Sequence, residues 1–181
     1  MKKIEKICIC VTGGHYYNWF GGDHFYEWLN EFCTNNPQFV PKIISWRPPD
    51  YLPNKVKEQF GENILYRENE GCDWGCYNHL HQHLTSNNLT DEFDCILFTH
   101  DDIMIEDRIW PWHLVEHLNK NPQYDWTSFF GQYMNVIEPR SKILRDDNLM
   151  RNGEHYFKSV IACCFGVRAN NHFFKNNPFV T

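Results

Sequence analysis

Four short apolar runs, each followed by a turn or a helical segment, constrain the fold of this chain more than any other feature of its sequence. The runs cover residues 7–12, 40–46, 63–67 and 95–99. The last run is almost wholly apolar, which is typical of a central parallel strand covered on both faces. Alternation of such strands with helices predicts an α/β fold with a mixed, mainly parallel sheet and right-handed crossovers.

Helical segments are expected between and after these strands. Asp23 can cap a helix whose apolar residues recur at helical spacing, namely Phe25, Trp28, Leu29 and Phe32. The other expected elements are helices at 54–60, from about 73 to 84 and at 109–118, and strands at 126–130 and 159–167. The polar stretch 139–156 is the best candidate for a mobile loop.

Composition and charge limit the possible partners of the chain. Its 181 residues show no repeat or linker, which predicts a single domain over residues 1–181. The net charge is −6 and no run of Lys or Arg occurs, so a nucleic-acid partner is not expected. No stretch is long enough to span a membrane, and the apolar segment near the N-terminus is too short for a secretory signal. A cytoplasmic protein is expected.

The eight cysteines are distributed as small buried apolar residues rather than as ligands or disulfide partners. Cys8 and Cys10 lie inside the first apolar run, and Cys95 opens the fourth. This placement indicates a reducing compartment. No Cys-x-x-Cys pair occurs, which disfavours structural zinc, although Cys72 and Cys76 could share a helix face.

Three histidines, at positions 79, 81 and 83, suggest a metal site at first sight. The segment is expected to be helical, and on a helix only His79 and His83, four residues apart, share a face. Two ligands without a third do not make a zinc site, so partly packed helix histidines are the preferred interpretation.

Polar residues follow three of the expected strands where each strand ends. They lie at 12–15, 69–75 and 100–102. Ligands of open α/β sheets bind outside the carboxyl ends of the strands, so these segments are expected to form one site.

The adjacent acids Asp101 and Asp102 are the most informative part of this set. Two neighbouring carboxylates repel each other unless a positive charge lies beside them. A Mg²⁺ or Mn²⁺ ion, held by carboxylates, waters and substrate phosphates, would supply that charge, and His100 could be a further ligand. The alternative is a solvated acidic turn, with Glu106 and Asp107 nearby.

The segment Asn69 to Asn78 resembles a motif of family-2-like glycosyltransferases, in which an Asn-x-Gly loop opens a helix that bears a second Asn. About twenty residues later those enzymes have an apolar strand ending in Asp-x-Asp, and here Ile96 to Ile103 occupies that place. The later segment Ser159 to Phe174 resembles the strand before the acceptor helix. The resemblance spans nearly the whole chain, although only the two central motifs are specific.

This resemblance implies a GT-A (Rossmann-like) fold and a metal-dependent transferase. It would move a sugar from a nucleoside-diphosphate sugar to a hydroxyl of a glycan or other acceptor, with Mn²⁺ or Mg²⁺ as cofactor. The implied metal ligands are Asp102, Asp101 and His100, and Asp102 is the more secure because His replaces the first acid of the motif. The implied donor-binding residues are Thr12, Gly13, His15, Asn69, Gly71, Asp73, Asn78 and Asp101.

The C-terminal part departs from the family pattern, because no acid follows the late strand before the sequence ends at Thr181. A C-terminally truncated chain, a catalytic base elsewhere, or a protein that no longer catalyses would each account for this. Candidate bases are Asp146, Asp147 and Glu154. The alternative functions are an inactive relic that binds a nucleotide-sugar or a partner, and a metal-dependent phosphohydrolase or nucleotidyltransferase.

Overall fold

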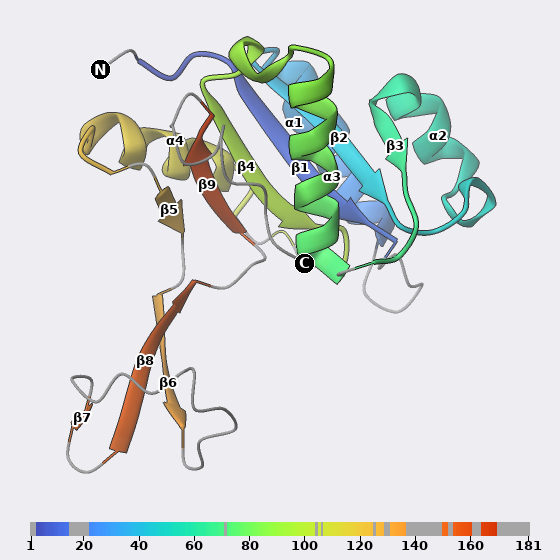
Figure 1. Cartoon of the computed structure of the whole chain (residues 1–181). Helices are drawn as coiled ribbons and strands as arrows, with labels where there is room; N and C mark the ends of the chain where they lie inside the picture. The colour runs from blue at the N-terminus through green and yellow to red at the C-terminus, as the bar shows by residue number, and fades with distance from the viewer. Residues whose placement is uncertain are drawn as a thin grey trace.

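A six-stranded mixed sheet forms the centre of the molecule in the computed structural model. The structure describes residues 3–14, 22–70, 72–103, 105, 107–124, 126–128, 131–136, 150–151, 154–160 and 164–169. Along the sheet the strands are β3 (Ile64–Tyr66), β2 (Phe39–Ser45), β1 (Ile7–Gly13), β4 (Cys95–His100), β9 (Cys164–Arg168) and β5 (Trp126–Ser128) (Figure 1). The first four are mutually parallel, and β9 runs antiparallel to both β4 and β5.

Helices cover both faces of this sheet, as the apolar runs predicted. One face is covered by α1 (Gly22–Asn35), α2 (Asn54–Phe60) and α4 (Trp110–Lys120). The other face is covered by α3 (Cys72–Ser86), which crosses in front of the strands in Figure 1. Short 3-10 turns lie at Pro49–Tyr51, Gly61–Asn63 and Thr90–Glu92. The predicted α/β fold with a mainly parallel sheet is therefore confirmed.

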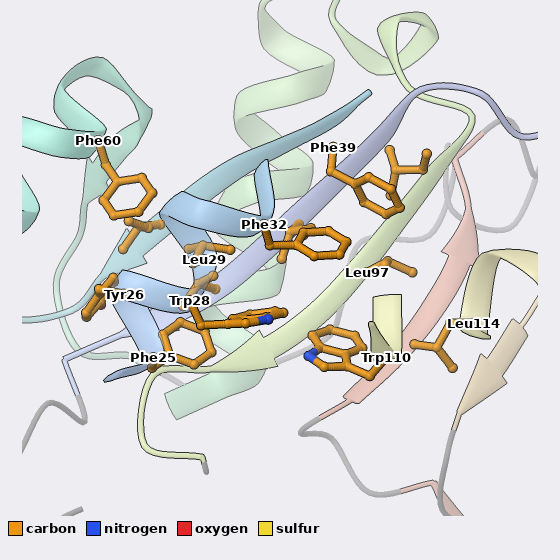
Figure 2. Packing of buried hydrophobic residues seen from close by; sticks show 14 of the residues in the cluster. Phe25, Tyr26, Trp28, Leu29, Phe32, Phe39, Phe60, Leu97, Trp110 and Leu114 are labelled. Carbon is orange, nitrogen blue, oxygen red and sulfur yellow. The ribbon is translucent and has the colours of Figure 1, made fainter. Parts of the chain in front are cut away.

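The core beneath α1 is built from aromatic side chains at the helical spacing of its sequence. Trp28 stacks on Trp110 of α4 with ring centroids 5.9 Å apart, and Phe32 meets Phe39 of β2 edge-on at 5.0 Å (Figure 2). Each fully buried large apolar side chain contributes roughly 1.5–3 kcal/mol. This contact set fixes α1 and α4 against the same face of the sheet.

The core beneath α3 contains the cysteines of the first strand. Cys8 and Cys10 are fully buried there, together with Cys76 of α3. Six cysteines are free thiols, namely Cys8, Cys10, Cys33, Cys76, Cys95 and Cys164. The prediction that Cys8, Cys10 and Cys95 act as small buried apolar residues is confirmed.

The strand predicted at 159–167 is wrong as a single element. The structure has β8 (Glu154–Val160), which pairs with β6 (Gly131–Val136) and β7 (Met150–Arg151) in a second, antiparallel sheet. The later strand β9 belongs to the main sheet instead. The apolar run is continuous in sequence, but its two halves pair with different strands, and pairing is a tertiary choice that the run does not encode.

The predicted loop at 139–156 is only partly described. Met150–Arg151 and the first residues of β8 form strands, which corrects the prediction for those positions. Residues 137–149 and 152–153 lie outside the described part. Among the helices that the structure describes, none combines the length and apolar character needed to cross a bilayer.

Candidate functional site

The carboxyl ends of β1, β2 and β4 are joined by backbone hydrogen bonds just beyond the sheet. Asp101 N donates to Thr12 O at 3.2 Å, and Trp46 N donates to Gly13 O at 3.2 Å. Arg67 N, directly after β3, donates to Ser45 O of β2 at 2.9 Å. The three polar segments that follow β1, β3 and β4 therefore start from the same edge of the sheet, as the parallel topology requires.

Asp101 is buried at this edge and holds the turn after β1. Its exposed fraction is 1%, and its Oδ2 accepts hydrogen bonds from Gly14 N at 3.0 Å and from Tyr26 Oη at 2.9 Å. Gly14 has a φ of +120°, a backbone conformation that side-chain-bearing residues rarely adopt. The carboxylate thus exchanges water for protein donors, which is what a buried charge needs.

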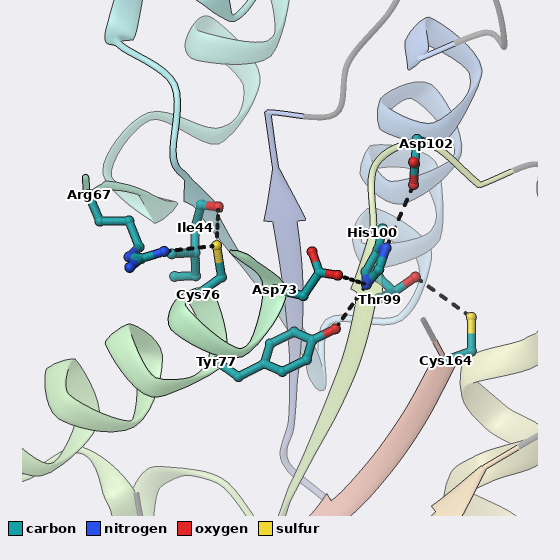
Figure 3. Close-up of polar contacts among 9 residues, drawn as sticks. All are labelled: Ile44, Arg67, Asp73, Cys76, Tyr77, Thr99, His100, Asp102 and Cys164. Carbon is teal, nitrogen blue, oxygen red and sulfur yellow. Dashed lines mark hydrogen bonds and ion pairs between the residues drawn. The ribbon is translucent and has the colours of Figure 1, made fainter. Parts of the chain in front are cut away.

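His100, the last residue of β4, lies between two carboxylates and a phenol (Figure 3). Its Nε2 is 3.1 Å from Tyr77 Oη and 3.6 Å from Asp73 Oδ2, both on α3. Its Nδ1 is 3.7 Å from Asp102 Oδ1. Burial raises the pKa of Tyr77, followed in size by the effects of Cys10 and Asp73, so the phenol keeps its proton. Its Oη can donate to Nε2 or accept from Nε2–H, according to the tautomer of the imidazole.

The two adjacent acids differ in access to solvent. The Asp102 side chain is 44% exposed, whereas Asp101 is almost fully buried. Consecutive residues at the end of a strand point in different directions, and here one carboxylate faces the interior while the other faces outward.

These residues fit a phosphate-bound Mg²⁺ or Mn²⁺ better than a preformed metal centre. Within the described residues, no group of three or more His, Cys, Asp or Glu side chains could hold a metal ion. Asp102 offers an exposed carboxylate, and both ions are commonly held by one or two carboxylates plus substrate phosphates and water. Imidazole suits softer metals, so the metal-ligand roles of His100 and Asp101 stay predictions.

A cation that the sequence reasoning missed lies beside the β1 turn. The Arg47 guanidinium lies 4.0 Å from the Trp46 ring centroid and 4.9 Å from that of Tyr51. Its Nε donates to Gly14 O at 3.4 Å. The available signal was its position directly after the second strand, but its contacts come from packing that no local pattern encodes.

The predicted donor-binding residues are divided between two sides of α3. Thr12 and Gly13 are buried at the end of β1, and Asp73 faces His100. Asn69 is exposed, and Asn78 lines a cavity on another flank of α3. Donor binding by all of these residues stays a prediction.

The remaining predicted site residues are mostly outside the described part of the chain. This applies to His15, Gly71, Asp146 and Asp147. Glu154 is the first residue of β8, and its backbone lies opposite that of Arg151 of β7 in the antiparallel sheet. Its role as a base stays a prediction.

Comparison with known proteins gives structural likeness only. No family model matches the chain, and no curated protein matches it either. A structure of CMP:2-keto-3-deoxy-manno-octonic acid synthetase complexed with CTP is similar, with a TM-score of 0.52, 9% identity, and 91% of this chain and 75% of that chain covered.

Two structures of 4-diphosphocytidyl-2C-methyl-D-erythritol synthase are also similar. One has a TM-score of 0.56 and 14% identity, with 93% of this chain and 77% of that chain covered. The other, from Anaerococcus prevotii, has a TM-score of 0.54 and 10% identity, with 91% and 70% covered. At these identities the likeness establishes the fold alone: the chain has the mainly parallel α/β architecture of these solved structures.

Proposed function

We propose that this chain is a transferase acting on a nucleotide-activated sugar, with its reacting groups at the carboxyl end of β4. The observation that carries the proposal is the cluster of His100, Asp102, Asp73 and Tyr77, assembled from β4 and α3 at that edge. This is where open α/β sheets bind ligands, and the sequence motifs resemble those of glycosyltransferases at the same two segments.

The segment after β2, which contacts Gly14 through Arg47, offers a suitable environment for the nucleotide. Arg47 contributes a fixed positive charge next to the Trp46 and Tyr51 rings. Aromatic faces can stack on a base, and a guanidinium can pair with phosphate oxygens. The overall negative charge of the chain therefore does not prevent binding of an anionic donor at this point.

Glycosyl transfer requires a group that takes the acceptor proton and a group that receives the diphosphate. Asp102 would hold Mg²⁺ or Mn²⁺, which neutralises charge on the leaving diphosphate. His100 can take the acceptor proton at Nδ1, the nitrogen on the side of the exposed Asp102, when Nε2 carries the hydrogen and donates it to Tyr77 Oη; Asp73 and Asp102 on the two sides of the ring stabilise the imidazolium. This role for His100 supplements the candidate bases inferred from sequence.

Nucleotidyl transfer is the second candidate function. The similar solved structures favour it: one is complexed with CTP, and the others are named as 4-diphosphocytidyl synthases. In that reaction a phosphorylated sugar or alcohol attacks a nucleoside triphosphate, and pyrophosphate leaves. The same cluster and the same metal site could serve either leaving group.

Product analysis separates the two reactions. The purified chain is incubated with Mn²⁺ and either nucleoside-diphosphate sugars with glycan acceptors or nucleoside triphosphates with sugar phosphates. Release of nucleoside diphosphate identifies glycosyl transfer, and release of pyrophosphate identifies nucleotidyl transfer. If no combination yields either product, catalysis is contradicted. The alternative of an inactive relic that only binds a nucleotide-sugar or a partner then remains.

The variant His100→Gln tests the proposed base. We expect turnover to fall about 100-fold or more, the usual contribution of general base catalysis, while donor affinity stays within about twofold. His24→Gln, at an exposed position of α1, is the matched control and should retain full turnover. Unchanged turnover in His100→Gln would exclude His100 as the base.

A further inference from the structure

An exposed indole, that of Trp74, lies beside the His100 cluster and takes no part in the chemistry proposed above. The residue is 44% exposed. It lies in the first turn of α3 between Asp73 and Tyr77, whose side chains both contact His100 (Figure 3). Single exposed apolar residues are ordinary on a protein surface, so exposure alone assigns no role. The packing behind this ring and its place along the sheet edge distinguish it.

Two buried aromatic side chains hold the indole in one orientation. Trp74 meets the Tyr77 ring edge-on, with centroids 5.7 Å apart and 88° between the ring planes. It also contacts Phe165 of β9, with centroids 6.4 Å apart, and Phe165 stacks on Phe98 of β4 at 4.6 Å. Phe98, Phe165 and Tyr77 are fully buried. A ring that is fixed from behind loses little conformational freedom when a ligand packs on its exposed surface, which favours binding.

The indole lies at the opposite end of the site from the environment expected for the nucleotide. Arg47 follows β2, His100 ends β4, and Trp74 contacts β9 through Phe165. Because the strand order is β2-β1-β4-β9, His100 lies between Arg47 and Trp74 along the sheet edge. A donor with its nucleotide at Arg47 and its reacting carbon at His100 leaves the Trp74 side for the acceptor.

The charge beside the indole disfavours an anionic ligand. Asp73, the residue before Trp74, has a side chain that is 25% exposed. Its carboxylate repels phosphate groups and accepts hydrogen bonds from hydroxyl groups. A pyranose ring has a face of C–H groups that can pack on an indole, and hydroxyl groups at its rim that can reach such a carboxylate. An aromatic surface bordered by a carboxylate therefore matches an unphosphorylated sugar.

We propose that Trp74 is the stacking platform for the acceptor, and that this acceptor is an unphosphorylated sugar, either free or as a unit of a glycan. Trp74 binds the sugar and has no part in proton transfer. The proposal rests on the proposed transferase function, because it names the second substrate of the same site. It also bears on the choice of reaction: an unphosphorylated acceptor fits glycosyl transfer, whereas nucleotidyl transfer as described above needs a phosphorylated one.

NMR of the indole N–H groups tests the platform without nucleotide or metal. The Trp74 resonance is assigned as the one that Trp74→Phe lacks. The probes are glucose, galactose, mannose, N-acetylglucosamine, their methyl glycosides and their 6-phosphates, with cytidine and tetramethylammonium as controls for other ligands of aromatic rings. We expect at least one neutral sugar to shift the Trp74 resonance in a saturable way, and its 6-phosphate to bind at least tenfold more weakly.

Variants measure how much the ring contributes to binding. We expect the affinity for that sugar to fall about tenfold in Trp74→Leu, which keeps an apolar side chain but no aromatic face, and about threefold or less in Trp74→Phe. Tyr124→Leu is the matched control. Tyr124 is 50% exposed, and its backbone O accepts from Arg168 Nε, which places it near the amino end of β4. This variant should bind the sugar as the unmodified chain does.

The proposal and the transferase function fail in different ways. Sugar binding at Trp74 in a chain that binds no nucleotide with Mn²⁺ would uphold the platform and contradict the transferase function. Mn²⁺-dependent nucleotide binding without any sugar effect on Trp74 would overturn the platform alone. A Trp74 resonance shifted only by sugar phosphates, cytidine or tetramethylammonium, or equal sugar affinity in Trp74→Leu and the unmodified chain, would overturn it too.

The probes also identify the source of the sugar. Equal binding of methyl glycosides and free sugars would support a unit of a glycan, and binding of free sugars alone would support a free monosaccharide. The resonance of the unmodified chain and the variant Trp74→Phe decide the proposal if Trp74→Leu fails to fold.

Discussion

At the scale of single residues, the two neighbouring acids after β4, Asp101 and Asp102, have different roles. Asp101 faces inward and ties the β1 turn to α1 through Gly14 N and Tyr26 Oη. Asp102 faces outward and has one contact with His100, at 3.7 Å. We therefore assign Asp101 to the architecture of the edge and leave Asp102 as the carboxylate available to a metal and a phosphate.

Removing the Tyr26 hydroxyl tests the structural role of Asp101. In Tyr26→Phe the buried carboxylate loses the hydrogen bond that Tyr26 Oη donates to its Oδ2, and we expect a loss of about 1–3 kcal/mol in the free energy of unfolding. Urea denaturation measures this change. Tyr66→Phe, in which the residue is 38% exposed, is the control and should change the free energy by less than about 0.5 kcal/mol.

Equal stability of the two variants would contradict the account of Asp101. It would mean that the carboxylate does not rely on the Tyr26 hydroxyl for its burial. Asp101 would then be free to act as a ligand, as the sequence alone suggested.

At the scale of elements, strands inside the main sheet could be predicted closely from sequence. The expected run 7–12 corresponds to β1 (Ile7–Gly13), and the run 95–99 corresponds to β4 (Cys95–His100). Both strands are covered on two faces, so a plain apolar run marks them. The division of 159–167 into β8 and β9 was missed because each half takes its hydrogen bonds from a different sheet.

The packing of the segment after β3 on α3 makes a prediction at Gly75. In a helix, replacing Gly by Ala normally stabilises by about 0.5–1 kcal/mol. Here the new Cβ would lie 1.8 Å from Glu70 O, a backbone atom that cannot move cheaply. We expect Gly75→Ala to lose about 1–3 kcal/mol instead, measured by thermal or urea unfolding.

A second alanine substitution on α3 is the matched control for Gly75. Thr85 is near the other end of the helix, and its hydroxyl donates back to His81 O at 2.8 Å. Thr85→Ala gains helix propensity without a clash, so its stability should be unchanged or slightly raised. Stabilisation in both variants would show that the segment does not lie on the helix as described.

At the scale of the whole molecule, the sequence located the candidate site but not its composition. The expectation that polar segments meet at the carboxyl ends of the strands correctly placed His100 and Asp102 at one edge with Asp73. Tyr77 and Arg47 were not identified as members, because one depends on the rotation of α3 and the other on aromatic packing after β2. Both are tertiary facts with no local signature.

The buried thiols predict how stability depends on alkaline pH. Burial raises the pKa of Cys8 and of Cys33 to about 12, from an ordinary value of 9.0. Between these values the unfolded chain releases thiol protons that the native state keeps, so the free energy of unfolding falls as pH rises. Each thiol contributes a slope of about 1.4 kcal/mol per pH unit.

Urea denaturation at pH 8, 9, 10 and 10.5 under reducing conditions measures this slope. Cys8→Ala should reduce the slope of the free energy of unfolding by the contribution of one thiol, which is about 1.4 kcal/mol per pH unit above pH 9. The same slope in the variant and in the unmodified chain would mean that Cys8 is not buried as a protonated thiol in the native state.

The central claim is that Asp102 lies in a metal-dependent nucleotide site, and calorimetric binding tests it most directly. Nucleoside-diphosphate sugars and nucleoside triphosphates are titrated, with and without Mn²⁺, into the unmodified chain, into Asp102→Asn and into Asp91→Asn. Asp91 is the control, because it is exposed and lies in the turn that precedes the amino end of β4. We predict Mn²⁺-dependent binding of one nucleotide that is weakened at least tenfold in Asp102→Asn and unchanged in Asp91→Asn. Binding that is independent of Mn²⁺ and equal in all three proteins, or no binding at all, would contradict the account.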